Sequence, residues 1–138
     1  MKFKAYAITN EIDLNKIASR CNIPKKYTWE EPLILQDEFL ASILGHRGEF
    51  FRVLQQTSRT QCAVMTIAPG ADGGPVEEHG GDQIVYVIEG DAVLRIEQQE
   101  HHAGAGTLIT IPAGANHHVR NPGPTPLFLL TVYAPPEY

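Results

Sequence analysis

The fold of this chain is decided by one stretch, residues 106–121, which reads GTLITIPAGANHHVRN. Residues 107–111 are rich in β-branched side chains and apolar on both faces, so they predict a strand inside a sandwich. A glycine stands on either side of this strand, where the backbone has to turn tightly. Pro112 ends the strand because proline has no N–H to donate to a sheet. His117 then begins a strand that runs back.

The same stretch follows the spacing G-x5-P-x-G-x2-H-x3-N without a gap. It resembles the second sequence motif of the cupin superfamily, and the chain is similar to its small single-domain members. The family's first motif, G-x5-H-x-H-x3,4-E-x6-G, is present upstream in altered form. Counting back from Gly90 places Gln83 at the position of the motif's Glu, His79 at its second His and Glu77 at its first His. The resemblance covers residues 50–138.

Short β-prone runs separated by glycine and proline lie on both sides of this stretch. Such spacing is typical of an all-β sandwich or barrel, and the cupin resemblance implies a jelly-roll barrel, or double-stranded β-helix. We predict this barrel over residues 49–138, with a tight hairpin at residues 89–91. His101 and His102 are expected in a solvated turn. The predicted strands are 50–55, 62–67, 83–88, 92–96, 107–111, 117–120 and 127–133.

Residues 1–48 carry mixed signals and predict a short, mainly helical extension packed on the outside of the barrel. Apolar residues recur at helical spacing between residues 14 and 21. A short strand is expected within residues 27–35, and a second helix around residues 39–44, ended by Gly45.

Length and composition indicate one globular domain. The chain has 138 residues, 43% of them hydrophobic, and a net charge of −5. This charge makes a nucleic-acid partner unexpected, and no apolar run is long enough to cross a membrane. Two cysteines without a C-x-x-C pair favour a reduced, cytoplasmic setting. Small proteins of the resembled family commonly pair through their sheets, so we expect a homodimer.

The resemblance implies one divalent transition metal inside the barrel, held by His79, His117, Gln83 and Glu77. Fe, Mn, Ni and Zn all remain open, since imidazole and carboxylate suit each of them. Strand alternation supports His117 as the inward residue and turns His118 away.

One departure from the motif matters for the site. Gln83 is a neutral amide where the motif has a carboxylate, which leaves the site one charge more positive. Glu77 can compensate for this loss. Glu78 takes the place of Glu77 if the motif's longer spacing applies.

Three functions are compatible with this pattern. The first is a metal-dependent enzyme that acts on a small polar molecule. The resemblance implies an oxygenase, an isomerase or a lyase. The second is a non-catalytic module that binds or senses a small ligand without a metal, in which the same residues form a polar pocket. The third is a purely structural domain whose N-terminal segment recruits a partner. The fold alone does not choose among the three.

Overall fold

The computed structural model describes residues 40–138, and residues 43–138 form a compact unit. This unit contains a short 3-10 helix, η1 (Leu44–His46), and eight strands. The helix predicted at residues 14–21 and the strand predicted within 27–35 lie outside the described residues. No helix in the described range is long and apolar enough to cross a membrane. The strands are β1 (Phe51–Gln56), β2 (Gln61–Ile67), β3 (Asp82–Glu89), β4 (Asp91–Ile96), β5 (Gln99–Gly104), β6 (Leu108–Ile111), β7 (His117–Arg120) and β8 (Leu127–Ala134).

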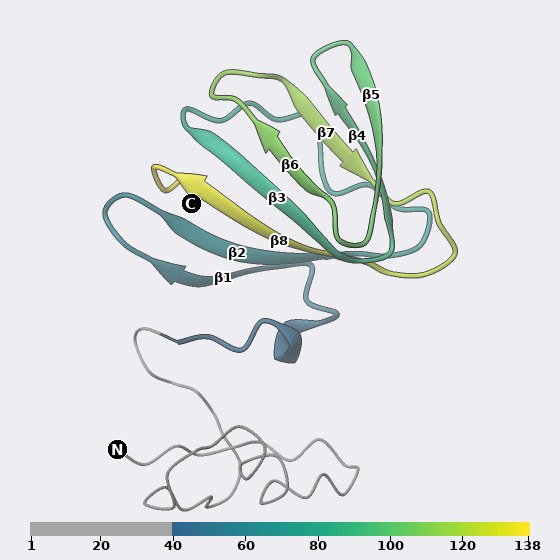
Figure 1. Ribbon diagram of the computed structural model, residues 1–138, viewed down its shortest axis with the longest axis horizontal. Helices are drawn as coiled ribbons and strands as arrows, with labels where there is room; N and C mark the ends of the chain where they lie inside the picture. The colour runs from purple at the N-terminus through teal and green to yellow at the C-terminus, as the bar shows by residue number, and fades with distance from the viewer. Residues whose placement is uncertain (1–39) are drawn as a thin grey trace, which may run out of the picture. The chain divides into compact units, whose positions relative to one another are not determined.

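The strands form two antiparallel sheets. The larger sheet has the order β1-β2-β8-β3-β6, which Figure 1 shows from the lower edge upward. The smaller sheet has the order β5-β4-β7. The buried core includes apolar side chains from both sheets, among them Val87, Leu94 and Leu129. The all-β class predicted from the sequence is therefore confirmed for the described residues.

All seven predicted runs are strands, but one strand was missed. β5 carries His101 and His102, which were expected in a turn. Its sequence, QEHHAG, has only one buried residue, Ala103. The strand is formed by pairing with β4 along its whole length rather than by a hydrophobic pattern of its own. Local sequence was therefore a poor guide to it.

The hairpin predicted at residues 89–91 was also wrong. β3 pairs with β6 and β8, whereas β4 pairs with β5 and β7, so this turn passes from one sheet to the other. Gly90 has a φ of +86°, and a Cβ there would lie 2.6 Å from the carbonyl oxygen of Pro126. Glycine is required both by the backbone conformation and by this close approach.

Two smaller expectations were also wrong. Residues 40–43 are not helical, and Gly45 lies inside η1 instead of ending a helix. β6 was expected to be apolar and covered on both faces, but Leu108 is 65% exposed. β6 is an edge strand, and the side of the larger sheet that faces away from the core leaves Leu108 uncovered.

Candidate metal centre

The candidate centre is built on a backbone pairing between two segments that are distant in the sequence. The Glu77 N–H donates to the His117 carbonyl at 2.9 Å, and the His117 N–H donates to the Glu77 carbonyl at 2.8 Å. This pair is an isolated antiparallel bridge. Residues directly opposite each other in such a pair carry their side chains on the same face. Both side chains consequently line the same cavity.

His79 reaches this place from the loop between β2 and β3. The Gly114 N–H donates to the His79 carbonyl at 2.8 Å, which ties that loop to the turn before β7. The His79 side chain is 6% exposed, and its ring centroid lies 4.8 Å from that of His117. Its Nε2 is buried, lies 3.7 Å from a carboxylate oxygen of Glu77, and has no hydrogen-bond partner among the described residues.

The ring of His117 is oriented by the backbone. Its Nδ1 lies 3.0 Å from the carbonyl oxygen of Ala115, and only a protonated nitrogen can donate there. The neutral ring therefore carries its lone pair on Nε2. Glu77, His79 and His117 each offer a ligand atom, and these atoms all lie within 4.8 Å of one another.

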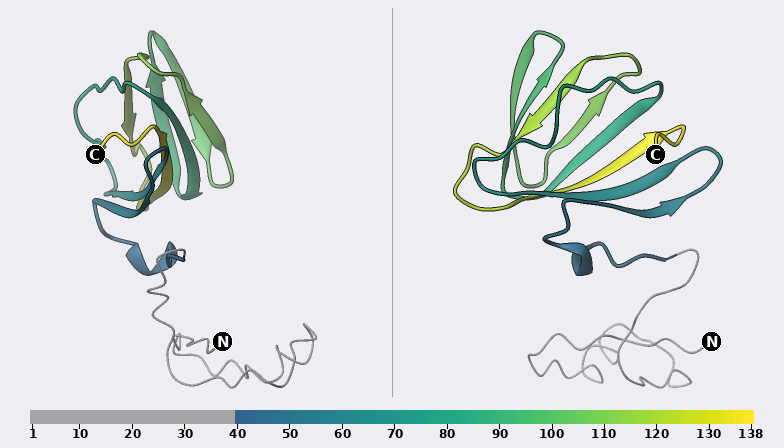
Figure 2. Two further views of the ribbon diagram at one scale, coloured as in Figure 1. Left: turned by 90° about the vertical axis from the view of Figure 1, so that its left-hand side faces the viewer. Right: turned by 180° about the vertical axis from the view of Figure 1, so that it is seen from behind.

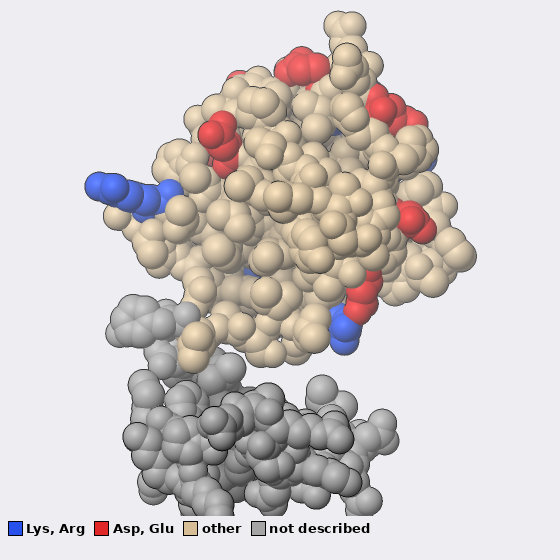
Figure 3. Space-filling model, in the orientation of Figure 1, with Lys and Arg blue, Asp and Glu red and all other residues tan. Residues whose placement is uncertain are grey.

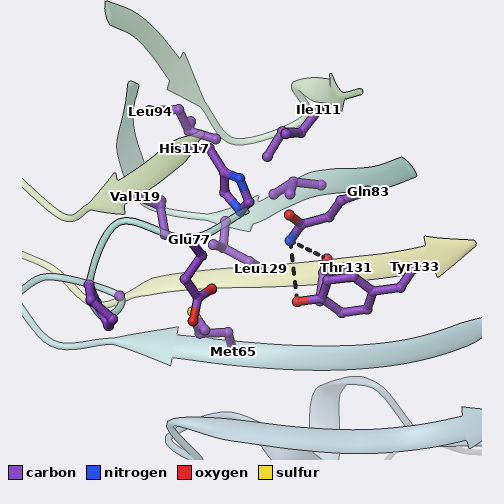
Figure 4. Close-up of a pocket in the computed structure, with 13 residues that line it drawn as sticks. Met65, Glu77, Gln83, Leu94, Ile111, His117, Val119, Leu129, Thr131 and Tyr133 are labelled. Atoms are coloured by element: carbon purple, nitrogen blue, oxygen red, sulfur yellow. Dashed lines mark hydrogen bonds between the residues drawn. The ribbon is translucent and has the colours of Figure 1, made fainter. Parts of the chain in front are cut away.

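Gln83 lines the same cavity from β3. Its Nε2 donates to Thr131 Oγ1 at 2.9 Å and to the hydroxyl of Tyr133 at 3.3 Å. Both partners lie on β8, and Figure 4 shows the two bonds on one side of the amide. The amide oxygen, Oε1, is buried and has no hydrogen-bond partner among the described residues. A buried acceptor without a donor is costly, so this oxygen is available to a bound group.

The cavity combines the polar side chains of Glu77, Gln83 and His117 with an apolar wall, and His79 is not among the residues that line it. It has a volume of about 40 Å³, enough for a few water-sized groups. Neither Lys nor Arg is among the residues that line it. Burial raises the pKa of the Tyr133 hydroxyl well above its ordinary value, so this group stays protonated at neutral pH. The apolar wall consists of Met65, Val85, Leu94, Ile111, Val119 and Leu129.

The donor set fits a first-row transition metal. Imidazole nitrogens and a carboxylate oxygen are common ligands of Fe, Mn, Ni and Zn, and an amide oxygen is an acceptable weaker one. Two buried atoms have no hydrogen-bond partner among the described residues, His79 Nε2 and Gln83 Oε1, and a bound cation would give both of them one. Metal binding remains a prediction, but the residues present suit it.

The structure separates the other sequence candidates from this cluster. Glu78, the alternative to Glu77, is exposed and does not belong to the converging group. His118 lies 3.7 Å from Asp72, outside the group, as strand alternation predicts. His102 is 75% exposed and lies beside Glu100.

Sequence reasoning missed the residues that β8 and the segment after it bring to the site. Thr131 and Tyr133 are two positions apart, so they share a face, and Tyr133 is the register partner of Gln83. The alternation could be read from the sequence, but the pairing of β8 with β3 could not. Glu137 also lies here, with Oε1 3.3 Å from His79 Nδ1.

Comparison with known proteins agrees with this architecture. The Bacillus halodurans protein BH2720 is 30% identical to this chain, with a TM-score of 0.68 over 76% of this chain and 86% of that one. A Methanocaldococcus jannaschii protein, described as an RmlC-like cupin with a double-stranded β-helix fold, is 20% identical. Its TM-score is 0.59, over 64% of this chain and 84% of that one. At this identity the likeness shows the fold alone.

One curated relative is a longer protein than this chain. The HTH-type transcriptional regulator PuuR of Escherichia coli K12 is 29% identical over 101 residues, which are 71% of this chain and 54% of the regulator. The chain thus spans about half the length of the curated relatives that it matches. The family model Cupin_2, described as the cupin domain, matches residues 63–133. This match covers β2 to β8 together with the candidate centre, and the chain therefore belongs to the cupin family.

Proposed function

We propose that this cupin domain binds one divalent transition metal through His79, His117 and Glu77, with Gln83 as a fourth ligand, and there binds or acts on a small polar molecule. The observation that carries the proposal is the buried, unpartnered Nε2 of His79 inside a group of three converging ligand atoms. A buried polar nitrogen that has no hydrogen-bond partner is costly, and a bound metal would remove that cost.

A bound metal would supply a Lewis acid that polarises an oxygen of the small molecule or activates water or O2. The protein's own residues would orient the reacting group. Gln83 is held by two β8 hydroxyls, and the apolar wall limits the entry of water. The oxygenase, isomerase and lyase classes all remain compatible with these groups.

A second function has specific support, namely a cupin that senses a small ligand without catalysis and without a metal. The carboxylate of the first motif is replaced by Gln83, which weakens the ligand set. The similarity to a transcriptional regulator also favours this reading. In such a sensor His79, Gln83 and His117 would hydrogen-bond the ligand directly.

Our other inferences concern the setting of this function. Residues 40–138 contain five arginines, no lysine and ten acidic residues, and the charged side chains on the face in Figure 3 are scattered over it. This charge supports the absence of a nucleic-acid partner for the barrel. A cytoplasmic location, a homodimer, and the division into residues 1–48 and 49–138 remain proposals.

The test is metal content after loading with Mn, Fe, Co, Ni or Zn and removal of free ions. The wild type is expected to hold about one equivalent of metal. His117→Ala removes a ligand nitrogen and should lose most of the metal while the barrel stays folded. His118→Ala is the matched control, because this neighbouring side chain lies outside the cluster, and it should keep the metal.

Two outcomes would count against the proposal. Equal loss of metal from the two variants would show that the bound ion does not depend on the inward face of β7. A wild type that stays metal-free under all loading conditions would favour the sensing function instead.

A further inference from the structure

The four residues after β8 fold back onto the candidate centre. Figure 2 shows this segment turning at the end of β8 beside β2, and Figure 1 shows the same from the opposite side. It brings Glu137 to His79, so that a carboxylate oxygen lies 3.3 Å from Nδ1. Nδ1 is the ring nitrogen that does not face the cluster, since Nε2 is the nitrogen near Glu77.

A buried amide holds this segment in place. The side chain of Gln61 on β2 is fully buried, and its Oε1 accepts from the backbone N–H groups of Tyr138 at 3.1 Å and Glu137 at 3.4 Å. Its Nε2 donates to the Tyr138 carbonyl oxygen and, at 2.9 Å, to Gln56 Oε1. Because Gln61 is fully buried, its amide depends on these partners. The backbone at Glu137 is therefore anchored, not merely nearby.

Aromatic packing fixes the segment from the other side. The ring of Tyr138 packs edge-on against Phe51, with centroids 5.1 Å apart, and against Tyr133, at 5.5 Å. It also lies edge-on to the His79 ring, at 5.9 Å. Burial, with the Glu77 carboxylate adding to it, raises the pKa of the Tyr138 hydroxyl. This packing leaves the Glu137 carboxylate only partly exposed beside the imidazole.

We propose that Glu137 is the positioning residue of His79, holding the ring with its proton on Nδ1 so that the lone pair of Nε2 faces Glu77 and His117. This inference rests on the proposed metal site. A carboxylate on the far nitrogen of a metal-binding histidine fixes the tautomer and the ring orientation and strengthens the ligand. The carbonyl of Ala115 does the equivalent for His117. Glu137 is not itself a member of the converging ligand group.

The first experiment does not depend on any metal. In metal-free, 15N-labelled protein at a pH where His79 is neutral, the ring nitrogen shifts report which nitrogen carries the proton. The wild type is expected to be protonated on Nδ1. Glu137→Ala should move most of the proton to Nε2, where the carboxylate of Glu77 is the remaining acceptor. Glu137→Gln keeps an acceptor oxygen and should keep the wild-type tautomer.

The second experiment measures Co2+ affinity by the visible absorption of the bound ion. Glu137→Ala is expected to weaken binding by about 10–100-fold, and Glu137→Gln by less. Glu100→Ala is the matched control. It also removes a carboxylate 3.3 Å from a histidine nitrogen, that of exposed His102, and should leave Co2+ affinity unchanged. Thermal unfolding of each variant reports whether it is folded.

The outcomes separate this inference from the proposed function. An unchanged tautomer in folded Glu137→Ala, or a Co2+ affinity within about twofold of the control, would overturn the role of Glu137 in a protein that binds metal. A wild type that binds no metal would overturn the metal site, while the tautomer measurement would still decide whether Glu137 orients His79. If Glu137→Ala does not fold, Glu137→Gln and its expected intermediate affinity provide the test.

Discussion

At Gln83 a neutral amide occupies the position where the resembled motif has a carboxylate. Its Nε2 is committed to Thr131 and Tyr133, which turns Oε1 away from them. Both partners are hydroxyls, and a hydroxyl can donate as well as accept. Tyr133 keeps its proton at neutral pH because burial raises its pKa. The same surroundings would therefore accept a carboxylate.

Gln83→Glu is expected to strengthen metal binding on the order of tenfold or more, because a carboxylate adds a full negative charge beside the cation in a partly desolvated site. Competition with a chromophoric chelator measures the change. Gln99→Glu adds the same charge at an exposed position on β5 and should change affinity little. An equal effect of the two substitutions would mean that Gln83 is not part of the metal site.

At the scale of elements, the residue before β3 and the end of β8 approach each other closely. This approach positions the residues that follow β8. Gly81 immediately precedes β3, and a Cβ there would lie 2.5 Å from the carbonyl oxygen of Ala134 and 2.6 Å from Pro135. Gly80, its neighbour, would meet nothing within 4 Å. Of these two glycines, only Gly81 has to lack a side chain for the residues at the end of β8 to pack against it.

Gly81→Ala is expected to destabilise the protein by about 1–3 kcal/mol, because a new methyl group must displace backbone. Denaturant unfolding measures the loss. The shifted segment should also carry Glu137 away from His79 and weaken Co2+ binding. Gly80→Ala provides the comparison and should behave like the wild type in both measurements. Equal stability of the two variants would contradict the close approach.

At the scale of the whole molecule, the larger sheet exposes apolar side chains on its outer face. Tyr86 and Leu108 are register partners on β3 and β6, and both are exposed, as is Ile84. Single exposed apolar residues are ordinary, but a group on one sheet face is a common site of association. This face supports the proposed homodimer.

Leu108→Glu is therefore expected to shift the protein toward monomer at micromolar concentration, since it places a charge within this exposed apolar group. Light scattering measures the molar mass. Val76→Glu, at an exposed apolar residue in the loop before β3, should leave the mass unchanged. A wild type that is already monomeric at this concentration would refute the homodimer.

Sequence alone determined those features that depend on local pattern and spacing. Seven of the strands and the family resemblance could be predicted from residues 106–121 and from the β-prone runs around them. This was possible because strand alternation, glycine turns and motif offsets are local properties. Glu77, His79, Gln83 and His117 were also selected in this way. The same reasoning failed at β5, where polar residues become a strand only through their pairing with β4.

Only the tertiary structure decided how distant segments meet. The bridge between Glu77 and His117, the partners of Gln83 on β8, and the placement of Glu137 by Gln61 all join residues far apart in the chain. Only the tertiary structure shows, too, that residues 89–91 connect one sheet to the other. Register and sheet membership result from packing over the whole unit, and a local window of sequence does not contain the other half of such contacts.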